Sequence, residues 1–302
     1  MPDIVALGEA LIEFTRLPEQ KEKGPIFRQG YGGDTSNAMI AAARQGARTG
    51  YLSAVGGDTF GEDLRTLWSN EGIDTRGVKT NPQDPTGCYF VLPDPVGRKF
   101  SYARRGSAAS FFGPDDLDEE VIATAQVLHV SALSQAISPS MRDAVTRAAT
   151  IARACGTLVA YDTNLRLNLW SIEQARPVIE AFLPLADIVL PSDDEAELLT
   201  GLSDPNELLT HFGRYGARYV ILKRGAKGPL MRTGGSTLTF DVPVAEAVDS
   251  TGAGDSFAGA FLAYLLETGK AEVAVFKAMQ VAARTVSGLG AVDPIPYRNE
   301  IE

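Results

Sequence analysis

Short apolar runs alternate with longer Ala-rich stretches from about Thr124 onward. The runs are rich in Val, Ile and Leu and have the length of buried strands, whereas the stretch 141–154 is typical of a helix. This alternation predicts repeated strand–helix–strand units, and therefore an α/β fold with a mostly parallel sheet. Strands are expected at 127–130, 158–161, 188–190 and 219–222.

Polar residues follow three of these predicted strands, namely Asp162, Ser192 and Lys223. Parallel α/β sheets place their ligands at the carboxyl ends of the strands, where such side chains meet. The pattern therefore predicts a ligand site at this edge of the sheet.

The segment from about Pro82 to Ser110 breaks the alternation. Apolar residues at 86–92 and an alternating run at 99–104 flank a turn at 93–97, which favours a β-hairpin. Residues 9–14 are expected to add a strand beside it. Because no long linker divides the sequence, we expect a single domain over residues 1–302 with a small β-sheet lid formed by about 9–16 and 82–110.

Composition and charge narrow the function. The 302 residues are 44% hydrophobic and 22% charged, which suits a globular protein with a large core. Lys and Arg total 28 against 38 Asp and Glu, a net charge of -10, which argues against nucleic acid as a partner. If the ligand is an anion, local arginines must bind it.

The cysteines and the apolar segments bear on location. Cys88 and Cys155 have no C-x-x-C spacing, which predicts reduced thiols in a cytoplasmic protein. The sequence starts without a basic segment followed by a long apolar one, so no export signal is expected. The longest uncharged run, 121–141, contains several polar residues, so no membrane span is expected either.

The segment Asp249 to Phe257 carries the strongest chemical signal. Gly252, Ala253 and Gly254 precede an apolar helix, and small residues at a helix N-terminus let backbone N–H groups approach an anion. Asp255 lies in the first turn, where its carboxylate could accept a proton from a substrate hydroxyl. The alternative is an ordinary glycine turn with Asp255 as a capping residue.

Two further segments are weaker on their own. Gly32, Gly33, Asp34 and Asn37 precede a predicted helix at 38–45 and offer polar groups for sugar hydroxyls, although a glycine pair before a capping residue is also an ordinary helix entry. The stretch 223–228 could hold a nucleotide or form a simple hairpin turn. Neither a Walker P-loop nor a dinucleotide fingerprint occurs in the sequence.

His129 lies in an apolar strand and is interpreted as a core residue.

Together these segments, with Ser192 to Glu195 in the middle of the chain, resemble the ribokinase-like (PfkB) carbohydrate kinases along essentially the whole sequence. The resemblance implies a three-layer α/β/α domain, Asp255 as catalytic base and the backbone of Gly252 to Gly254 as an anion hole. It also implies ATP with Mg²⁺, and Glu195 in the magnesium network. Ser192 departs from the asparagine common in the family.

Other roles come from the same resemblance. Adenine and ribose would lie against Ser192, Lys223, Gly225, Gly228 and the helix from Ala282 to Ser287. Relatives bind a monovalent cation such as K⁺ near the position of Asp249. Gly33, Asp34 and Asn37 would hold the sugar.

The substrate prediction rests on the segments 102–108 and 162–166, which resemble the subgroup that phosphorylates 2-keto-3-deoxygluconate. The resemblance implies that Tyr89, Tyr102, Arg104 and Arg166 surround the acid sugar. Two guanidinium groups suit a carboxylate. The alternative is that both arginines form surface ion pairs. A fructokinase or another neutral-sugar kinase of the family stays open, and so does a non-catalytic sugar sensor.

An exposed face of a small lid sheet is commonly covered by pairing with a second copy. We therefore expect a homodimer or a higher homo-oligomer that forms through the lid.

Overall fold

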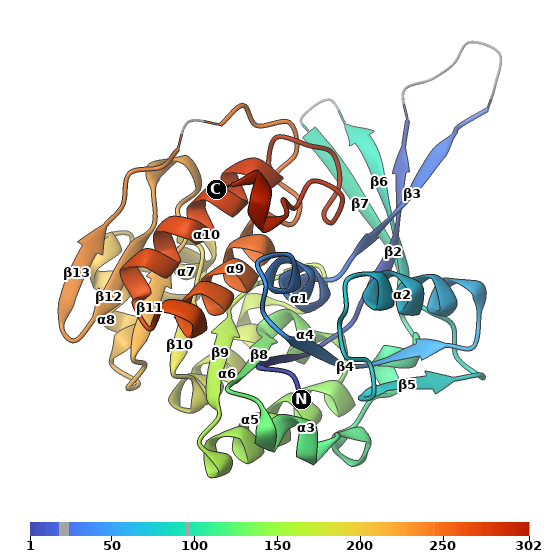
Figure 1. Cartoon of the computed structure of the whole chain (residues 1–302), viewed down its shortest axis with the longest axis horizontal. Helices are drawn as coiled ribbons and strands as arrows, with labels where there is room; N and C mark the ends of the chain where they lie inside the picture. Colours follow the sequence, from blue (N-terminus) through green and yellow to red (C-terminus); the bar gives the residue numbers. More distant parts are fainter. Residues whose placement is uncertain (18–23, 95–96, 244, 302) are drawn as a thin grey trace.

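The computed structural model describes residues 1–17, 24–94, 97–243 and 245–301, and the strands in these residues form two sheets (Figure 1). The larger sheet has the order β13-β12-β11-β10-β9-β8-β1-β4-β5. Pairing is parallel from β5 to β11 and antiparallel for β12 and β13. The strands are β1 (Ile4–Leu7), β4 (Thr49–Gly56), β5 (Val78–Asn81), β8 (Val127–Ser131), β9 (Leu158–Asp162), β10 (Ile188–Leu190), β11 (Tyr219–Leu222), β12 (Leu230–Thr233) and β13 (Ser236–Thr239).

The four predicted strands are confirmed as β8, β9, β10 and β11, each within one residue of its expected bounds. Every residue of β8 and β10 is buried. These strands are fully buried because both faces of a parallel sheet are covered. Their sequences are therefore continuous apolar runs and do not alternate between apolar and polar residues.

Helices cover both faces of the larger sheet and produce three layers (Figure 1). One face carries α1 (Asp34–Arg44), α2 (Thr59–Asn70), α9 (Ala253–Thr268) and α10 (Ala271–Thr285). The opposite face carries α3 (Glu119–Thr124), α4 (Ala132–Ile137), α5 (Pro139–Cys155), α6 (Ile172–Phe182), α7 (Asp193–Thr200) and α8 (Pro205–Gly213). Short 3-10 turns occur at Ala108–Phe111, Pro114–Asp116, Leu183–Leu185, Gly225–Lys227 and Arg298–Glu300. The predicted α/β/α architecture is confirmed.

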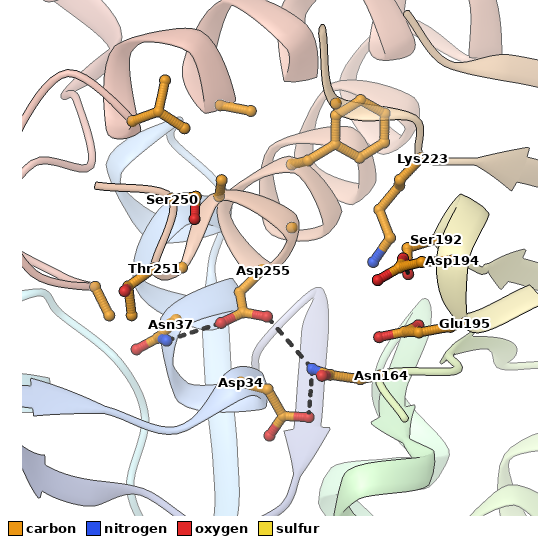
Figure 2. Close-up of a pocket in the computed structure, with 18 of the residues that line it drawn as sticks. Asp34, Asn37, Asn164, Ser192, Asp194, Glu195, Lys223, Ser250, Thr251 and Asp255 are labelled. Atoms are coloured by element: carbon orange, nitrogen blue, oxygen red, sulfur yellow. Dashed lines mark hydrogen bonds between the residues drawn. The ribbon is translucent and has the colours of Figure 1, made fainter. Parts of the chain in front are cut away.

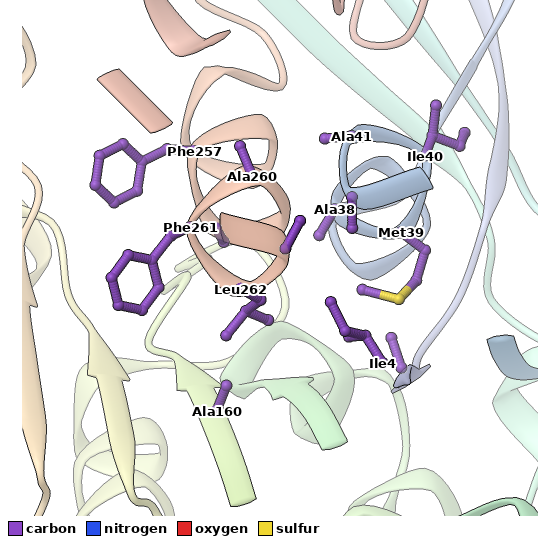
Figure 3. Close-up of a cluster of buried hydrophobic side chains, with 14 of the residues drawn as sticks. Ile4, Ala38, Met39, Ile40, Ala41, Ala160, Phe257, Ala260, Phe261 and Leu262 are labelled. Carbon is purple, nitrogen blue, oxygen red and sulfur yellow. The ribbon is translucent and has the colours of Figure 1, made fainter. Parts of the chain in front are cut away.

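Helices α1 and α9 pack closely above the sheet, and Figure 3 shows the small side chains of Ala38 and Ala260 on their facing sides. A Cβ atom at Gly259 would lie only 1.9 Å from the carbonyl oxygen of Ala38. Glycine at 259 therefore permits the two backbones to touch. The close approach brings the N-terminal ends of the two helices, which carry Asp34, Asn37 and Asp255, to one place.

The smaller sheet has the order β3-β2-β6-β7, with β2 (Leu11–Arg16), β3 (Phe27–Gly32), β6 (Cys88–Asp94) and β7 (Gly97–Ala103). The predicted hairpin is confirmed as the antiparallel pair β6 and β7, and β2 is the expected additional strand. Residues 95 and 96 of the predicted turn lie outside the described residues. Strand β3 is not predicted, because its glycines and exposed polar residues do not form an apolar run.

The segment 289–298 crosses α1 and ties it to the loop before α9. The guanidinium of Arg44 donates to the carbonyl oxygens of Val292 at 3.0 Å and Ile295 at 2.6 Å. The same group forms a buried ion pair with Glu71 at 2.6 Å. Further along the segment, the amide of Gly290 donates to the carboxylate of Asp249 at 2.8 Å. Residues near both ends of the sequence are thereby joined.

No helix in the described ranges is both long and apolar enough to span a bilayer.

Candidate active site

A cavity of about 1500 Å³ opens at the carboxyl ends of the parallel strands, between the larger sheet and the small sheet. Its walls contain most of the residues singled out from the sequence, and Figure 2 shows part of them facing one another. The exceptions, which do not line it, are Gly32, Asp162, Gly228, Asp249 and Ser287. The cavity has room for two small molecules at once, since ordinary ligand pockets measure about 300–1000 Å³.

The loop before α9 is held in place from behind. The carboxylate of Asp249 accepts hydrogen bonds from the Thr251 amide at 3.0 Å, from the Thr251 hydroxyl at 2.7 Å and from the Gly290 amide at 2.8 Å. Hydrogen-bond donors thus engage both of its oxygens. This arrangement fits a role in holding the loop better than a cation ligand, and the monovalent cation stays a prediction.

Glycine is required at 252 for a different reason from that at 254. Gly252 has φ of +76°, and a Cβ there would lie 2.6 Å from the carbonyl oxygen of Ala291. At Gly254 the backbone is helical, and a Cβ would meet only the Lys223 ammonium, at 3.4 Å. The first position therefore shapes the turn, while the second keeps open the space in front of the helix N-terminus, where N–H groups are free to bind an anion.

Asp255 lies in the first turn of α9 and is surrounded by polar groups. Its carboxylate accepts hydrogen bonds from the amide of Asn37 at 2.8 Å and from the amide of Asn164 at 3.5 Å, and Asn164 also donates to Asp34 at 3.2 Å (Figure 2). Burial, reinforced by the negative charge of Asp34, raises the pKa of Asp255 to about 7. A carboxyl group with this pKa is suited to exchange a proton near neutral pH.

Three buried oxygen atoms beside Asp255 have no hydrogen-bond partner among the residues that the structure describes: Oδ1 of Asp34, Oδ1 of Asn37 and Oδ1 of Asn164. Burying such acceptors unpaired is costly, so the site is completed by a molecule that supplies donors. Sugar hydroxyls are donors of this kind. Asn164, with φ of +23°, was not assigned a role from the sequence, although it lies in the segment 162–166 that follows β9.

Lys223 follows β11, and its ammonium lies 2.6 Å from the carboxylate of Asp162. Figure 2 shows its side chain pointing to the wall that carries Ser192, Asp194 and Glu195. Burial lowers the pKa of Lys223, but the attraction of Asp162 and of other carboxylates outweighs it, so that the net pKa is raised. Lys223 is therefore charged at neutral pH.

Glu195 already has partners in the protein. One oxygen accepts from the Thr163 hydroxyl at 2.9 Å and the other lies 3.3 Å from the Arg166 guanidinium. The neighbouring Asp194 accepts from the Ser192 hydroxyl at 2.8 Å. Among the described residues no cluster of three or more His, Cys, Asp or Glu side chains forms a metal cage. A few carboxylates at the wall fit Mg²⁺, which is ordinarily held by phosphates, water and one or two carboxylates.

The two predicted arginines have different surroundings. Arg166 is half-exposed, with 43% of its side chain accessible. Arg104 is buried and forms an ion pair with the equally buried Glu9, whose carboxylate also accepts from the Ser107 hydroxyl at 2.5 Å. A surface ion pair is therefore the wrong description of Arg104. Within the described part of the chain, Nε of Arg104 has no hydrogen-bond partner, and both arginines line the cavity.

Tyr89 and Tyr102 stack in the small sheet with ring centroids 5.8 Å apart, and both line the cavity. The Tyr89 hydroxyl donates to the buried carboxylate of Glu13. A Cβ at Gly32 would collide with that hydroxyl, so the missing side chain at 32 makes room for it. Because its proton is committed to Glu13, the Tyr89 oxygen can only accept a hydrogen bond from a ligand. The sequence predicts a strand at 9–14 but no role for Glu9 or Glu13, the two carboxylates within that range.

Two residues expected at the nucleotide, Gly228 and Ser287, do not line the cavity, and their contact with the nucleotide stays a prediction. Helix α10 ends at Thr285, so Ser287 lies beyond the helix, where its hydroxyl donates to the carbonyl oxygen of Arg284 at 2.7 Å. Gly228 has φ of +78°, and a Cβ there would collide with the carbonyl oxygen of Phe240, which makes it a turn residue. Helix α1 also begins earlier than predicted, at Asp34, because Gly33 with φ of +112° turns the chain directly into it.

Known proteins resemble the chain over its whole length. A model of the pfkB family carbohydrate kinases matches residues 1–298. A 2-dehydro-3-deoxygluconokinase of Thermoproteus tenax is 32% identical over 100% of this chain and 94% of its own length. A probable fructokinase-4 of Arabidopsis thaliana is also 32% identical, over 99% of this chain and 95% of its own.

Among solved structures, a putative ribokinase II from E. coli in complex with ATP and Mg²⁺ is 28% identical, covers 100% of this chain and 98% of its own, and has a TM-score of 0.91. Sequence and structure thus point to the same family.

Proposed function

Since the chain belongs to the pfkB family of carbohydrate kinases, we propose that it transfers the γ-phosphoryl group of ATP to the 6-hydroxyl of 2-keto-3-deoxygluconate. The products are ADP and 2-keto-3-deoxy-6-phosphogluconate. This acid sugar is the 2-dehydro-3-deoxygluconate in the name of the Thermoproteus tenax relative. The observation that carries the choice is the pair of cavity-lining guanidinium groups, Arg104 and Arg166.

Asp255 is the proposed base. Its carboxylate takes the proton of the sugar 6-hydroxyl while the oxygen forms its bond to the γ-phosphorus and the bond from that phosphorus to the β-γ bridging oxygen breaks. A pKa of about 7 leaves a large share of the carboxylate ionised at neutral pH. Asn37 and Asn164 donate to it and fix its direction.

The N-terminal turn of α9 is the proposed anion hole. The Ala253 amide already donates to the carbonyl oxygen of Ser250 at 3.2 Å, so the backbone N–H groups of Gly254 and Asp255 are the proposed donors. The Asp249 contacts fix the loop before the reaction. Donors that need no rearrangement stabilise the developing phosphoryl charge most effectively.

ATP and Mg²⁺ are the proposed co-substrate and metal, and the structure of the E. coli relative contains both. Gly225 and Ala282 line the part of the cavity assigned to the nucleoside. Glu195 and Asp194 would hold the metal, directly or through water. When bound, the metal neutralises phosphate charge.

Each arginine keeps N–H groups for the sugar carboxylate. Glu9 neutralises one side of Arg104, and Glu195 is 3.3 Å from one nitrogen of Arg166, which leaves other donors of each five-donor fork. A neutral hexose has no group that needs two guanidinium partners. The sugar hydroxyls are the proposed partners of the unpaired oxygens of Asp34, Asn37 and Asn164.

A fructokinase is the second candidate, since the Arabidopsis thaliana relative is as similar as the one from Thermoproteus tenax. A coupled ADP assay of the purified protein against 2-keto-3-deoxygluconate, gluconate, fructose and ribose separates them. We expect the highest kcat/KM with 2-keto-3-deoxygluconate. Preference for fructose would support the second candidate, and binding of a sugar without turnover of ATP would identify a sensor.

Assembly through the small sheet is a separate proposal. Phe27 and Phe100 of that sheet are exposed. Pairing of two small sheets would cover such residues. Light scattering should find a dimer or a larger assembly, and a monomer at working concentrations would refute it.

A further inference from the structure

The ammonium of Lys223 lies between Asp162 and the first turn of α9. Its Nζ atom is 2.6 Å from a carboxylate oxygen of Asp162 and 3.4 Å from the point that a Cβ of Gly254 would occupy. The ammonium therefore lies against the first turn of α9, directly in front of the proposed anion hole. By contrast, Lys227 in the same loop pairs at 2.9 Å with Asp193, and its side chain is 67% exposed.

Several carboxylates surround the proposed reacting centre, so a buried cation there would reduce the repulsion of a bound polyphosphate. The carboxylates of Asp34, Asp162, Asp194, Glu195 and Asp255 all lie in or beside the cavity. A polyphosphate entering among them meets repulsion that grows where water is excluded. The half-exposed Arg166 is already beside Glu195, whereas the Lys223 side chain is only 15% exposed. A buried ammonium loses little to solvent screening.

We propose that Lys223 is a catalytic residue that contacts the transferring phosphoryl group and complements the backbone donors of α9, instead of binding adenine or ribose. This inference rests on the proposed phosphoryl transfer. Three ammonium N–H donors can bind the carboxylate of Asp162 and a phosphoryl oxygen at the same time. An ammonium fixed in this way stabilises charge on the phosphoryl group in the transition state.

Asp162 is a positioning residue for this ammonium. One of its oxygens holds Nζ of Lys223, and the other accepts from the backbone amide of Asn164 at 3.1 Å. The same carboxylate thus fixes the lysine and the segment that carries Asn164 toward the base. Loss of its charge should disturb both.

Lys223 also acts on Asp255 through space. Its positive charge lowers the pKa of Asp255, against the raising effects of burial, Asp34 and Asp162, and alongside the hydrogen bond from Asn37. Two other titratable groups interact with Asp255, Arg166 from the segment after β9 and Tyr89 from β6. Removing the lysine charge should therefore slow phosphoryl transfer and move the activity profile to higher pH.

The test compares Lys223→Met, Lys223→Arg and the control Lys79→Met, which removes an exposed charge on β5. Steady-state kinetics are measured with whichever sugar the parent protein phosphorylates, so the outcome does not depend on the substrate being the acid sugar. In Lys223→Met we expect kcat to fall about a hundredfold and the KM for ATP to change less than tenfold. ADP affinity by calorimetry should stay within about twofold, because ADP lacks the γ-phosphoryl group.

Two further readouts separate catalysis from folding. The acidic limb of the kcat/KM profile should move to higher pH in Lys223→Met and stay in place in Lys223→Arg, which keeps the charge. Lys223→Arg should retain most of the parent Tm and recover part of kcat. The inference is overturned if Lys223→Met keeps the parent kcat, or if ADP and ATP binding weaken equally. A parent protein that turns over no sugar instead refutes the proposed function.

Discussion

The two ends of the cavity are built in different ways. At the proposed phosphate end, Gly252, Gly254 and Asp255 are nearly consecutive, and only the proposed partner Lys223 comes from a distant segment. At the proposed sugar end, Tyr89, Arg104 and Arg166 come from separate segments, and each contacts a carboxylate from another segment. A substitution in the local turn affects all of its groups together, whereas each long-range side-chain pair can be changed without the others. The two relatives that are equally similar to this chain are named after different sugars.

The phosphate end should be broken most severely by Asp255→Asn. The amide keeps the size of the carboxylate but cannot accept the proton, so kcat should fall roughly a hundredfold to ten-thousandfold for every accepted sugar. ATP affinity, measured by calorimetry, should change little. Near-parental turnover would eliminate Asp255 as the base.

The space in front of α9 is probed by Gly254→Val. Since φ at 254 is not positive, the backbone tolerates a side chain, and the added methyl groups project toward Lys223 and the phosphate path. Displacing a reacting group by about 1 Å can cost about a hundredfold in kcat, and we expect a loss of that order with a small change in Tm. Gly254→Ala serves as the graded control and should lose less. A fully active Gly254→Val enzyme would mean that phosphate passes elsewhere.

The sugar end should respond in a substrate-specific manner. Arg166→Ala removes a charge-assisted contact worth about 1.5–3 kcal/mol, so kcat/KM for 2-keto-3-deoxygluconate should fall roughly tenfold to a hundredfold. For a neutral analogue without the carboxylate, kcat/KM of Arg166→Ala should fall far less. The control Arg105→Ala changes an exposed neighbour of Arg104 and should keep the parent kcat/KM with both substrates.

Arg104→Ala should show the same selectivity together with a lower Tm, because Glu9 would be left buried without its partner. Equal losses with acid and neutral sugars in both variants would contradict carboxylate binding.

The ionisation of Asp255 predicts that kcat/KM depends on pH in the same way for every accepted sugar. With a pKa of about 7 in the folded protein, kcat/KM should fall about tenfold for each pH unit below 7, for acid and neutral sugars alike. A profile that stays flat down to pH 5 would exclude this assignment.

The stability of the fold should depend on pH in the opposite direction from activity. The pKa rises from 3.8 in the unfolded chain to about 7 in the folded one, so the folded state binds more protons and ionisation of Asp255 destabilises the fold as pH rises through this window. Asp255→Asn should therefore have a higher Tm than the parent at pH 8, and the difference should shrink toward pH 5. Thermal unfolding followed by circular dichroism at the two pH values checks this.

The smallest effect is expected from Glu13→Gln. An amide can donate to the Tyr89 oxygen and so reverse the direction of that hydrogen bond, which turns Tyr89 from an acceptor into a donor toward the sugar. We expect a change of a few-fold in the KM for the sugar with kcat almost unchanged. Thr15→Val, which removes the other donor to Glu13, is the control and should leave the KM unchanged.

The same contrast explains what could be predicted from the sequence. Strands such as β10 and the turn at 252–255 are encoded by neighbouring residues, so apolar runs and small-residue spacing reveal them. The partners of Arg104 and Lys223 are more than 60 positions away, and nothing in a single sequence pairs them. The same holds for Asn164, whose partners Asp34 and Asp255 are about 130 and 91 positions away.

The segment 289–298 has a consequence for the order of synthesis. Its amide at Gly290 holds the Asp249 carboxylate, its carbonyl groups at Val292 and Ile295 hold Arg44 of α1, and Ala291 closes over Gly252. A ribosome delivers α1 early and this segment some 250 residues later, although domains tend to fold as they emerge. The turn at 252–255 can therefore be locked only after this segment has left the exit tunnel, and we expect the proposed phosphoryl transfer to begin no earlier.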